Sequence, residues 1–182
     1  SGSALLLEIY RTLKQLIETQ TIETPERTIR FLWVPEFHGT IPWILEKIKK
    51  EDFKPIHCIN LDMVGEHPAR VGYPFTFSKT SISTPSFLND LISDNIELIK
   101  DDFSMIEQNG WPFPWNSRIQ PYSGGSDQIL FTDEPLRIPA VMFGHSDTFH
   151  HTNLDTIDKV DPTTLKRVGI LTTLTIIQCS YH

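Results

Sequence analysis

The sequence predicts a three-layer α/β/α sandwich with a mostly parallel central sheet. Helical patterns and short apolar runs alternate along the chain without an internal repeat, which is typical of α/β domains. Two of the apolar runs end in an acidic residue, and open α/β sheets place their ligands at such strand ends. With 182 residues the chain is long enough to bury a core, so we interpret residues 1–182 as one domain, or most of one.

The first elements follow from apolar spacing and helix start signals. Leucine and isoleucine recur at helical spacing over residues 4–19, and Ser1 or Ser3 can cap that helix. Residues 28–34 form an apolar run that predicts a buried strand. A short helix is expected from Thr40, because a proline stands in its first turn.

The run over residues 56–65 is the second predicted strand. It is almost continuously apolar before Asp62, which favours a strand covered on both faces. Gly65 follows three residues after the acid, so Asp62 has two interpretations. It either caps a turn, as Asp and Gly often do, or it is a ligand at the end of a strand.

The second half of the chain continues the pattern. We expect a short strand or extended arm over residues 71–79 and a long helix over residues 84–108. The aromatic and proline residues at 111–115 line a pocket or form a rigid connector. The loop at 122–127 is followed by a last strand over residues 138–143 and by a polar loop, residues 144–155, with three histidines. Asp161 and Pro162 open the closing helix.

Composition limits the possible partners. A net charge of −7 without a basic block argues against nucleic acid and anionic membranes as partners. No apolar run reaches the ~18 residues that cross a bilayer. Cys58 and Cys179 lie in predicted buried elements and form no metal-binding spacing, which favours a reducing compartment. We therefore expect a cytoplasmic protein that binds neither nucleic acid nor membrane.

Three strand ends carry possible metal ligands. They are Glu36, Asp62, and the pair His150 and His151. Strand ends converge in space, and carboxylate with imidazole suits zinc, cobalt or manganese in a hydrolytic site. The alternative is that Glu36 is a loop acid and that the two histidines form a surface turn.

Several short motifs, in this order, resemble the M28 family of co-catalytic zinc aminopeptidases. They are Ser-Gly-Ser-Ala-Leu-Leu-Leu-Glu at residues 1–8, Phe-Leu-Trp-Val-Pro-Glu at 31–36, Asn-Leu-Asp-Met-Val-Gly at 60–65, Gly-Ser-Asp at 125–127, and His-Thr-Asn-Leu-Asp-Thr at 151–156. Residues 34–42 are similar to the DUF4910-type branch, in which Pro-Glu replaces the usual Glu-Glu. The resemblance covers nearly the whole chain.

The resemblance implies a zinc-exopeptidase fold and an aminopeptidase with two zinc ions, acting on peptides with a free N-terminus. It implies that Asp62 binds the first metal and His151 the second. Glu36 matches either the general base or a metal ligand, and these two roles stay open. His150 stands where the family has a tyrosine that stabilises the oxyanion, and Asp127 matches an acid that could receive the α-amine.

The resemblance also implies ligands that are not in the chain. The family carries a His-x-Asp motif and a bridging aspartate before the Ser-Gly with which this sequence opens. We therefore expect the sequence to be the C-terminal part of a metallopeptidase-like domain, with little activity of its own. Two other functions stay open: a binding module on the same fold, and a hydrolase of another amide. Homo-oligomer formation is a further open expectation.

Overall fold

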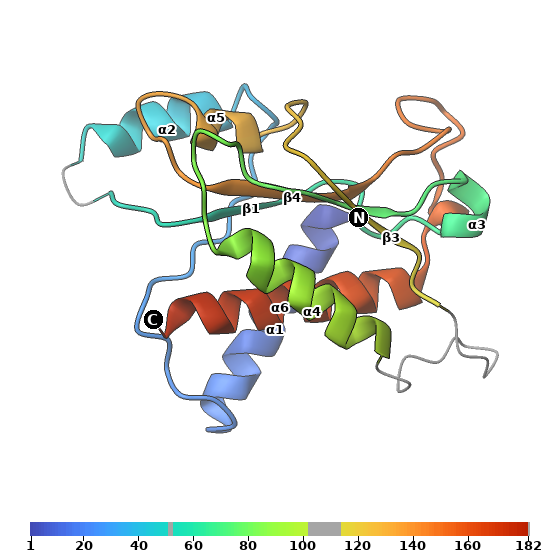
Figure 1. Cartoon of the computed structure of the whole chain (residues 1–182), viewed down its shortest axis with the longest axis horizontal. Coiled ribbons are helices and arrows are strands. Elements are labelled where there is room, and N and C mark those ends of the chain that lie inside the picture. The colour runs from blue at the N-terminus through green and yellow to red at the C-terminus, as the bar shows by residue number, and fades with distance from the viewer. Residues whose placement is uncertain (51–52, 102–113, 182) are drawn as a thin grey trace.

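The computed structural model describes residues 1–50, 53–101 and 114–181, and it shows the predicted sandwich (Figure 1). The helices are α1 (Gly2–Glu18), α2 (Thr40–Ile48), α3 (Pro68–Val71), α4 (Leu88–Asp101), α5 (Gln128–Thr132), the 3-10 helix η1 (Ile157–Lys159) and α6 (Pro162–Ser180). The strands are β1 (Cys58–Leu61), β2 (Phe75–Ser78), β3 (Ser117–Gln120) and β4 (Ala140–His145).

The four strands form one sheet in the order β1-β4-β2-β3. β1 pairs with β4 and β2 pairs with β3 in parallel, whereas β2 and β4 are antiparallel. The mostly parallel sheet of the sequence prediction is therefore confirmed. Among these strands β1 lies at one edge, so one of its two sides has no strand partner in the described part of the chain.

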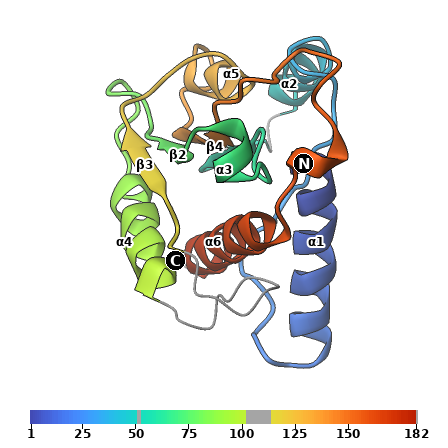
Figure 2. The ribbon, with the colours of Figure 1, turned by 90° about the vertical axis from the view of Figure 1, so that its right-hand side faces the viewer.

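Helices cover both faces of the sheet. Figure 2 shows α1, α4 and α6 on one face and α2 and α5 on the other. The main core lies under the larger helical layer, where the rings of Phe75 and Phe77 each lie 5.8 Å from that of Phe143. A smaller core, which includes Ile44, Phe131 and Ile138, lies beneath α2 and α5.

Most predicted helices are confirmed, with shifted ends. The predicted helix at residues 84–108 begins only at Leu88, so Phe87 precedes its first turn and is 60% exposed. Its predicted end lies outside the described residues, as do residues 111–113 of the aromatic cluster. Trp115 of that cluster packs at 4.9 Å on Phe75, which favours the connector interpretation for this residue. Within the described ranges, no helix combines the length and apolar character needed to span a bilayer.

The prediction of a strand at residues 28–34 is wrong. These residues are half-buried or exposed and join no ladder. Ile29 and Phe31 still pack against the main core, which is why the segment is apolar. The expected burial of β1 on both faces is also wrong, because all four of its residues are half-buried. Both segments border the same cavity, which separates the open edge of β1 from residues 28–34.

Candidate active site

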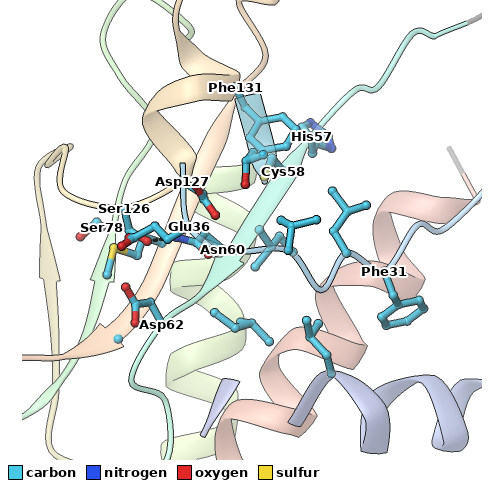
Figure 3. A pocket seen from close by; sticks show the side chains of 18 of the residues that line it. Phe31, Glu36, His57, Cys58, Asn60, Asp62, Ser78, Ser126, Asp127 and Phe131 are labelled. Carbon is cyan, nitrogen blue, oxygen red and sulfur yellow. Dashed lines mark hydrogen bonds between the residues drawn. The ribbon is translucent and has the colours of Figure 1, made fainter. Parts of the chain in front are cut away.

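This cavity has a volume of about 1300 Å³ and lies where β1 and β4 end (Figure 3). Its walls come from residues 26–36 on one side and residues 53–63 on the other, with further residues from the loops after β3 and β4. All the predicted site residues line it: Glu36, Asp62, Asp127, His150 and His151. Four segments that are distant in sequence thus contribute to one cavity.

Asp62 continues the backbone path of β1. Its N–H donates to the carbonyl of Phe143 at 3.0 Å, so the carboxyl group is attached to a hydrogen-bonded part of the sheet. The side chain is half-buried and borders the cavity. A rigid strand end is a suitable place for a functional group, because it holds a side chain more narrowly than a loop does.

Glu36 lies in a tight turn that Asp127 stabilises. The N–H of Phe37 donates to Oδ1 of Asp127 at 2.8 Å, and Phe37 has a left-handed φ of 53°. Within the same turn the N–H of Gly39 donates to the carbonyl of Pro35 at 2.8 Å. Asp127 therefore positions the turn that carries Glu36, a role that the sequence did not predict. Its predicted role as a substrate-binding acid is not tested by this contact.

The two histidines lie on the exposed loop after β4. Their rings stack with centroids 3.6 Å apart, and His151 has a left-handed φ of 58°. Both residues are exposed, as the surface-turn interpretation requires, yet both also border the cavity. The structure thus leaves both interpretations of this pair open.

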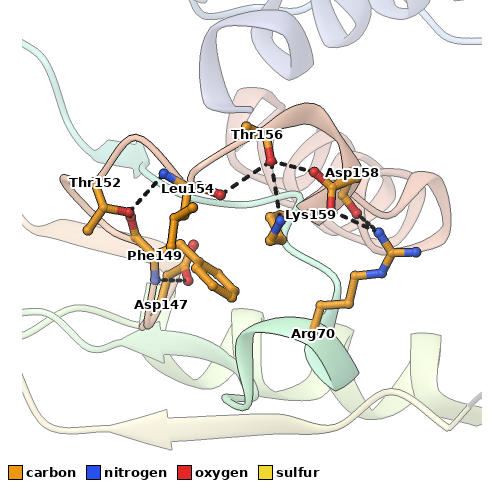
Figure 4. Close-up of polar contacts among 8 residues, drawn as sticks. All are labelled: Arg70, Asp147, Phe149, Thr152, Leu154, Thr156, Asp158 and Lys159. Atoms are coloured by element: carbon orange, nitrogen blue, oxygen red, sulfur yellow. Dashed lines mark hydrogen bonds and ion pairs between the residues drawn. The ribbon is translucent and has the colours of Figure 1, made fainter.

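Polar contacts anchor this loop to α3 (Figure 4). Arg70 of α3 lies 3.3 Å from the carboxylate of Asp158, and the ammonium group of Lys159 lies 4.8 Å from the ring centroid of Phe149. All these contacts are near the surface, where single ion pairs are weak. The first contact joins η1 to α3, and the second joins η1 to Phe149 in the loop that carries His151.

The sequence analysis missed several polar residues at the cavity. Asn60 of β1 donates to Oγ of Ser126 at 2.9 Å and to Oε1 of Gln128 at 3.1 Å, which fixes the glycine-containing loop against the sheet. His145 ends β4, and its side chain is fully buried. The prediction ended this strand at Phe143 and placed His145 in the loop. In a strand, alternate residues share a face, so extending the predicted strand two residues beyond Phe143 would have placed His145 on the same buried face.

One thiol and one carboxyl group near the site have shifted pKa values. Burial, with a smaller effect of the Asp127 carboxylate, raises the pKa of Cys58 to about 12, so its thiol stays protonated and is no nucleophile at neutral pH. Burial alone would raise the pKa of Glu66. Hydrogen bonding and charge from His145, with smaller help from Ser1, outweigh it and lower that pKa.

The residues present do not by themselves form a metal site. In residues 1–50, 53–101 and 114–181, no three side chains of His, Cys, Asp or Glu come together closely enough to hold an ion. Glu36, Asp62 and His151 have suitable ligand chemistry and share the cavity, but they do not close a coordination shell. The described residues can therefore supply only part of a metal site.

Comparisons with known proteins agree with this architecture. The structure is similar to a zinc aminopeptidase from Bacillus subtilis, with a TM-score of 0.74 and 19% identity over 99% of this chain and 41% of that one. It is also similar to an aminopeptidase from Aneurinibacillus sp. strain AM-1, with a TM-score of 0.52 and 22% identity over 79% of this chain and 31% of that one. At these identities the likeness establishes the fold alone. The chain spans less than half the length of these solved structures.

Sequence comparison gives the family. A search of curated proteins finds no match. The family model described as Peptidase family M28 matches residues 1–176, which is nearly all of the sequence. The chain therefore belongs to peptidase family M28.

Proposed function

We propose that the protein is an aminopeptidase that removes N-terminal residues from peptides with a free α-amine. One observation carries the proposal. The residues that the sequence predicts for a metallopeptidase site come from four segments, and all of them line one cavity at the carboxyl end of β1. Active sites of α/β enzymes lie in this position. Membership of a peptidase family narrows the reaction to peptide hydrolysis.

The roles of the residues follow the family resemblance. Glu36 acts as general base for a water molecule or as a ligand, and Asp62 and His151 are ligands of two zinc ions. His150 donates a hydrogen bond to the oxyanion, and Asp127 binds the amine while it holds the Glu36 turn. Zinc, when bound, would supply an activated water and polarise the scissile carbonyl. The Pro35-Glu36 pair, in place of the usual Glu-Glu, supports our proposal that the chain belongs to the DUF4910-type branch.

We propose that the missing ligands come from polypeptide outside this sequence. The open edge of β1 and the cavity beside it leave room for a further extended segment next to Asp62. The 182-residue chain alone should then bind divalent metal weakly and hydrolyse little peptide. Elemental analysis and hydrolysis of aminoacyl-anilides test this, and tight stoichiometric zinc with strong activity would contradict it.

Site variants of the natural-length protein test the enzymatic function. Glu36→Gln and Asp62→Asn should lower kcat on aminoacyl-anilides by about 100-fold or more, as expected for a general base or a group that activates water. The matched controls are Glu97→Gln and Asp94→Asn, because both residues are exposed on α4, away from the cavity. Equal activity of site and control variants would reject the proposed roles.

A binding module is the second candidate. It is favoured by the absence of a three-ligand group among the described side chains. In that case calorimetry would show that the natural-length protein binds peptides, and no cleavage would be detected. A panel with free and acetylated amines separates a third possibility, because an amide hydrolase of another kind would also accept blocked substrates. The cytoplasmic location, homo-oligomer formation and lack of nucleic-acid and membrane partners stay predictions.

A further inference from the structure

The turn that follows Asp62 is held in an unusual backbone conformation. Met63, the next residue, has a left-handed φ of 55°. Residues other than glycine rarely adopt this backbone conformation, and it persists only where surrounding contacts enforce it. Because Met63 directly follows Asp62, this conformation sets the course of the chain immediately after Asp62.

His145 makes the first of these contacts. Its side chain is fully buried at the end of β4, and Nδ1 lies 3.0 Å from the carbonyl oxygen of Met63. A carbonyl oxygen can only accept, so Nδ1 must carry the hydrogen. The other ring nitrogen, Nε2, is buried and has no hydrogen-bond partner in the described structure. Nδ1 is thus the nitrogen through which this imidazole acts on the turn.

Ser1 and Glu66 make the second contact. The N–H of Val64 donates to Oγ of Ser1 at 3.0 Å, and that hydroxyl donates to Oε1 of Glu66 at 3.2 Å. The second oxygen of the Glu66 carboxylate lies 3.5 Å from Nδ1 of His145. Both polar groups of the peptide unit between Met63 and Val64, which directly follows the left-handed Cα, are therefore bound to one cluster of three side chains.

We propose that His145 is a positioning residue: its Nδ1–H holds Met63 in the left-handed conformation and thereby directs the Asp62 carboxylate into the cavity. Ser1, supported by Glu66, completes the clamp by accepting from the N–H of the same peptide unit. The effect on catalysis rests on the proposed function, whereas the effect on the turn does not. The rival view is a histidine that only fills the core, where its ring lies 5.6 Å from that of Phe75.

Two amide substitutions separate these views. In His145→Asn the side-chain nitrogen falls where Nδ1 was, so it can still donate to Met63. In His145→Gln the nitrogen falls near the position of Nε2, so that bond is lost although the side chain is larger and equally polar. A residue that only fills space should tolerate glutamine at least as well as asparagine.

The experiment has one arm that needs no activity. In the natural-length protein, nitrogen-15 NMR should show hydrogen on Nδ1 of His145, and the amide resonances of residues 62–65 should stay in place in His145→Asn and move in His145→Gln. An imidazole without hydrogen on Nδ1, or unmoved resonances in both variants, would overturn the proposal. The wild-type measurement decides even if a variant fails to fold.

The second arm measures turnover of aminoacyl-anilides. We expect His145→Gln to lower kcat on the order of 10-fold or more, the usual effect of losing a group that orients an active-site ligand, with KM little changed, and His145→Asn to restore most of it. Equal kcat in the two variants would refute positioning while the proposed function stands. A wild-type protein without turnover would refute the proposed function, and the NMR arm would still decide the role of His145.

Discussion

Replacing Gly144 of β4 with alanine should disturb the candidate site through the backbone. A Cβ atom at this position would lie 2.5 Å from the carbonyl oxygen of Asp62. Nonbonded heavy atoms normally keep about 3.5 Å, so the two strand ends would have to separate by about 1 Å. Because Asp62 also donates its N–H to Phe143 at 3.0 Å, the movement strains that hydrogen bond as well.

The expected cost is that of overpacking a rigid interior. Inserting one methyl group where the backbone must move typically costs about 1–3 kcal/mol. For a chain of this size each kcal/mol lowers Tm by about 2–4 °C, so about 2 kcal/mol corresponds to about 4–8 °C. The flexible end of a side chain could move aside at a lower free-energy cost, but here the opposing atom belongs to the main chain.

Gly124→Ala is the matched control. Its Cβ would meet only the tip of the Ile129 side chain, at 3.3 Å, so Tm should change little. Differential scanning calorimetry measures both variants, and the amide resonance of Asp62 reports whether the strand end moves. The reasoning is refuted if Gly144→Ala melts with the control and leaves Asp62 in place.

Three further predictions concern single groups. Asp161→Ala should cost about 1–2 kcal/mol, because the first turn of α6 loses its N-cap acceptor, and Asp161→Asn should regain most of it in thermal unfolding; equal losses would contradict this. Hydrogen bonds from Lys159 and Thr156 lower the pKa of Asp158 to about 2, so its stabilisation is present above the unfolded pKa of about 3.9 and is lost as pH falls towards 2. Asp158→Asn should flatten Tm against pH over that interval, and parallel curves for both proteins would refute it. Cys58, with a pKa of about 12, should be alkylated at pH 8 far more slowly in the folded than in the unfolded protein, as measured by peptide mass spectrometry; equal rates would count against the raised pKa.

The long helices could be predicted because each has a clear local signal. α1 places Leu5, Ile9 and Leu13 on one buried stripe, and α6 begins at an aspartate that accepts two backbone N–H groups. The strand β3 was missed because its sequence, Ser-Arg-Ile-Gln, has no apolar alternation and two of its four residues are exposed. Its strand conformation depends on pairing with β2, which the local sequence does not encode.

The residues of the candidate site could be predicted from the sequence, but the hydrogen bonds between them could not. Glu36 and Asp62 could be found because each follows an apolar run, and open α/β sheets place their ligands at strand ends. The bond from Phe37 to Asp127 joins residues 90 positions apart, so no local pattern reveals it. His145 was missed for a related reason: its burial comes from packing on Phe75 of a neighbouring strand and not from its own segment.

Residues 28–34 were predicted as a strand but form none, and this affects how Glu36 is held in the site. An extended apolar segment becomes a strand only when another edge accepts its backbone hydrogen bonds. Here a cavity of about 1300 Å³ lies between the segment and the edge strand β1. Glu36 follows the segment directly, so its position is fixed by the turn and by Asp127 rather than by a sheet. Asp62, in contrast, is held by the ladder to β4. The two acids of the candidate site are thus held by different means, because only one of them follows a paired strand.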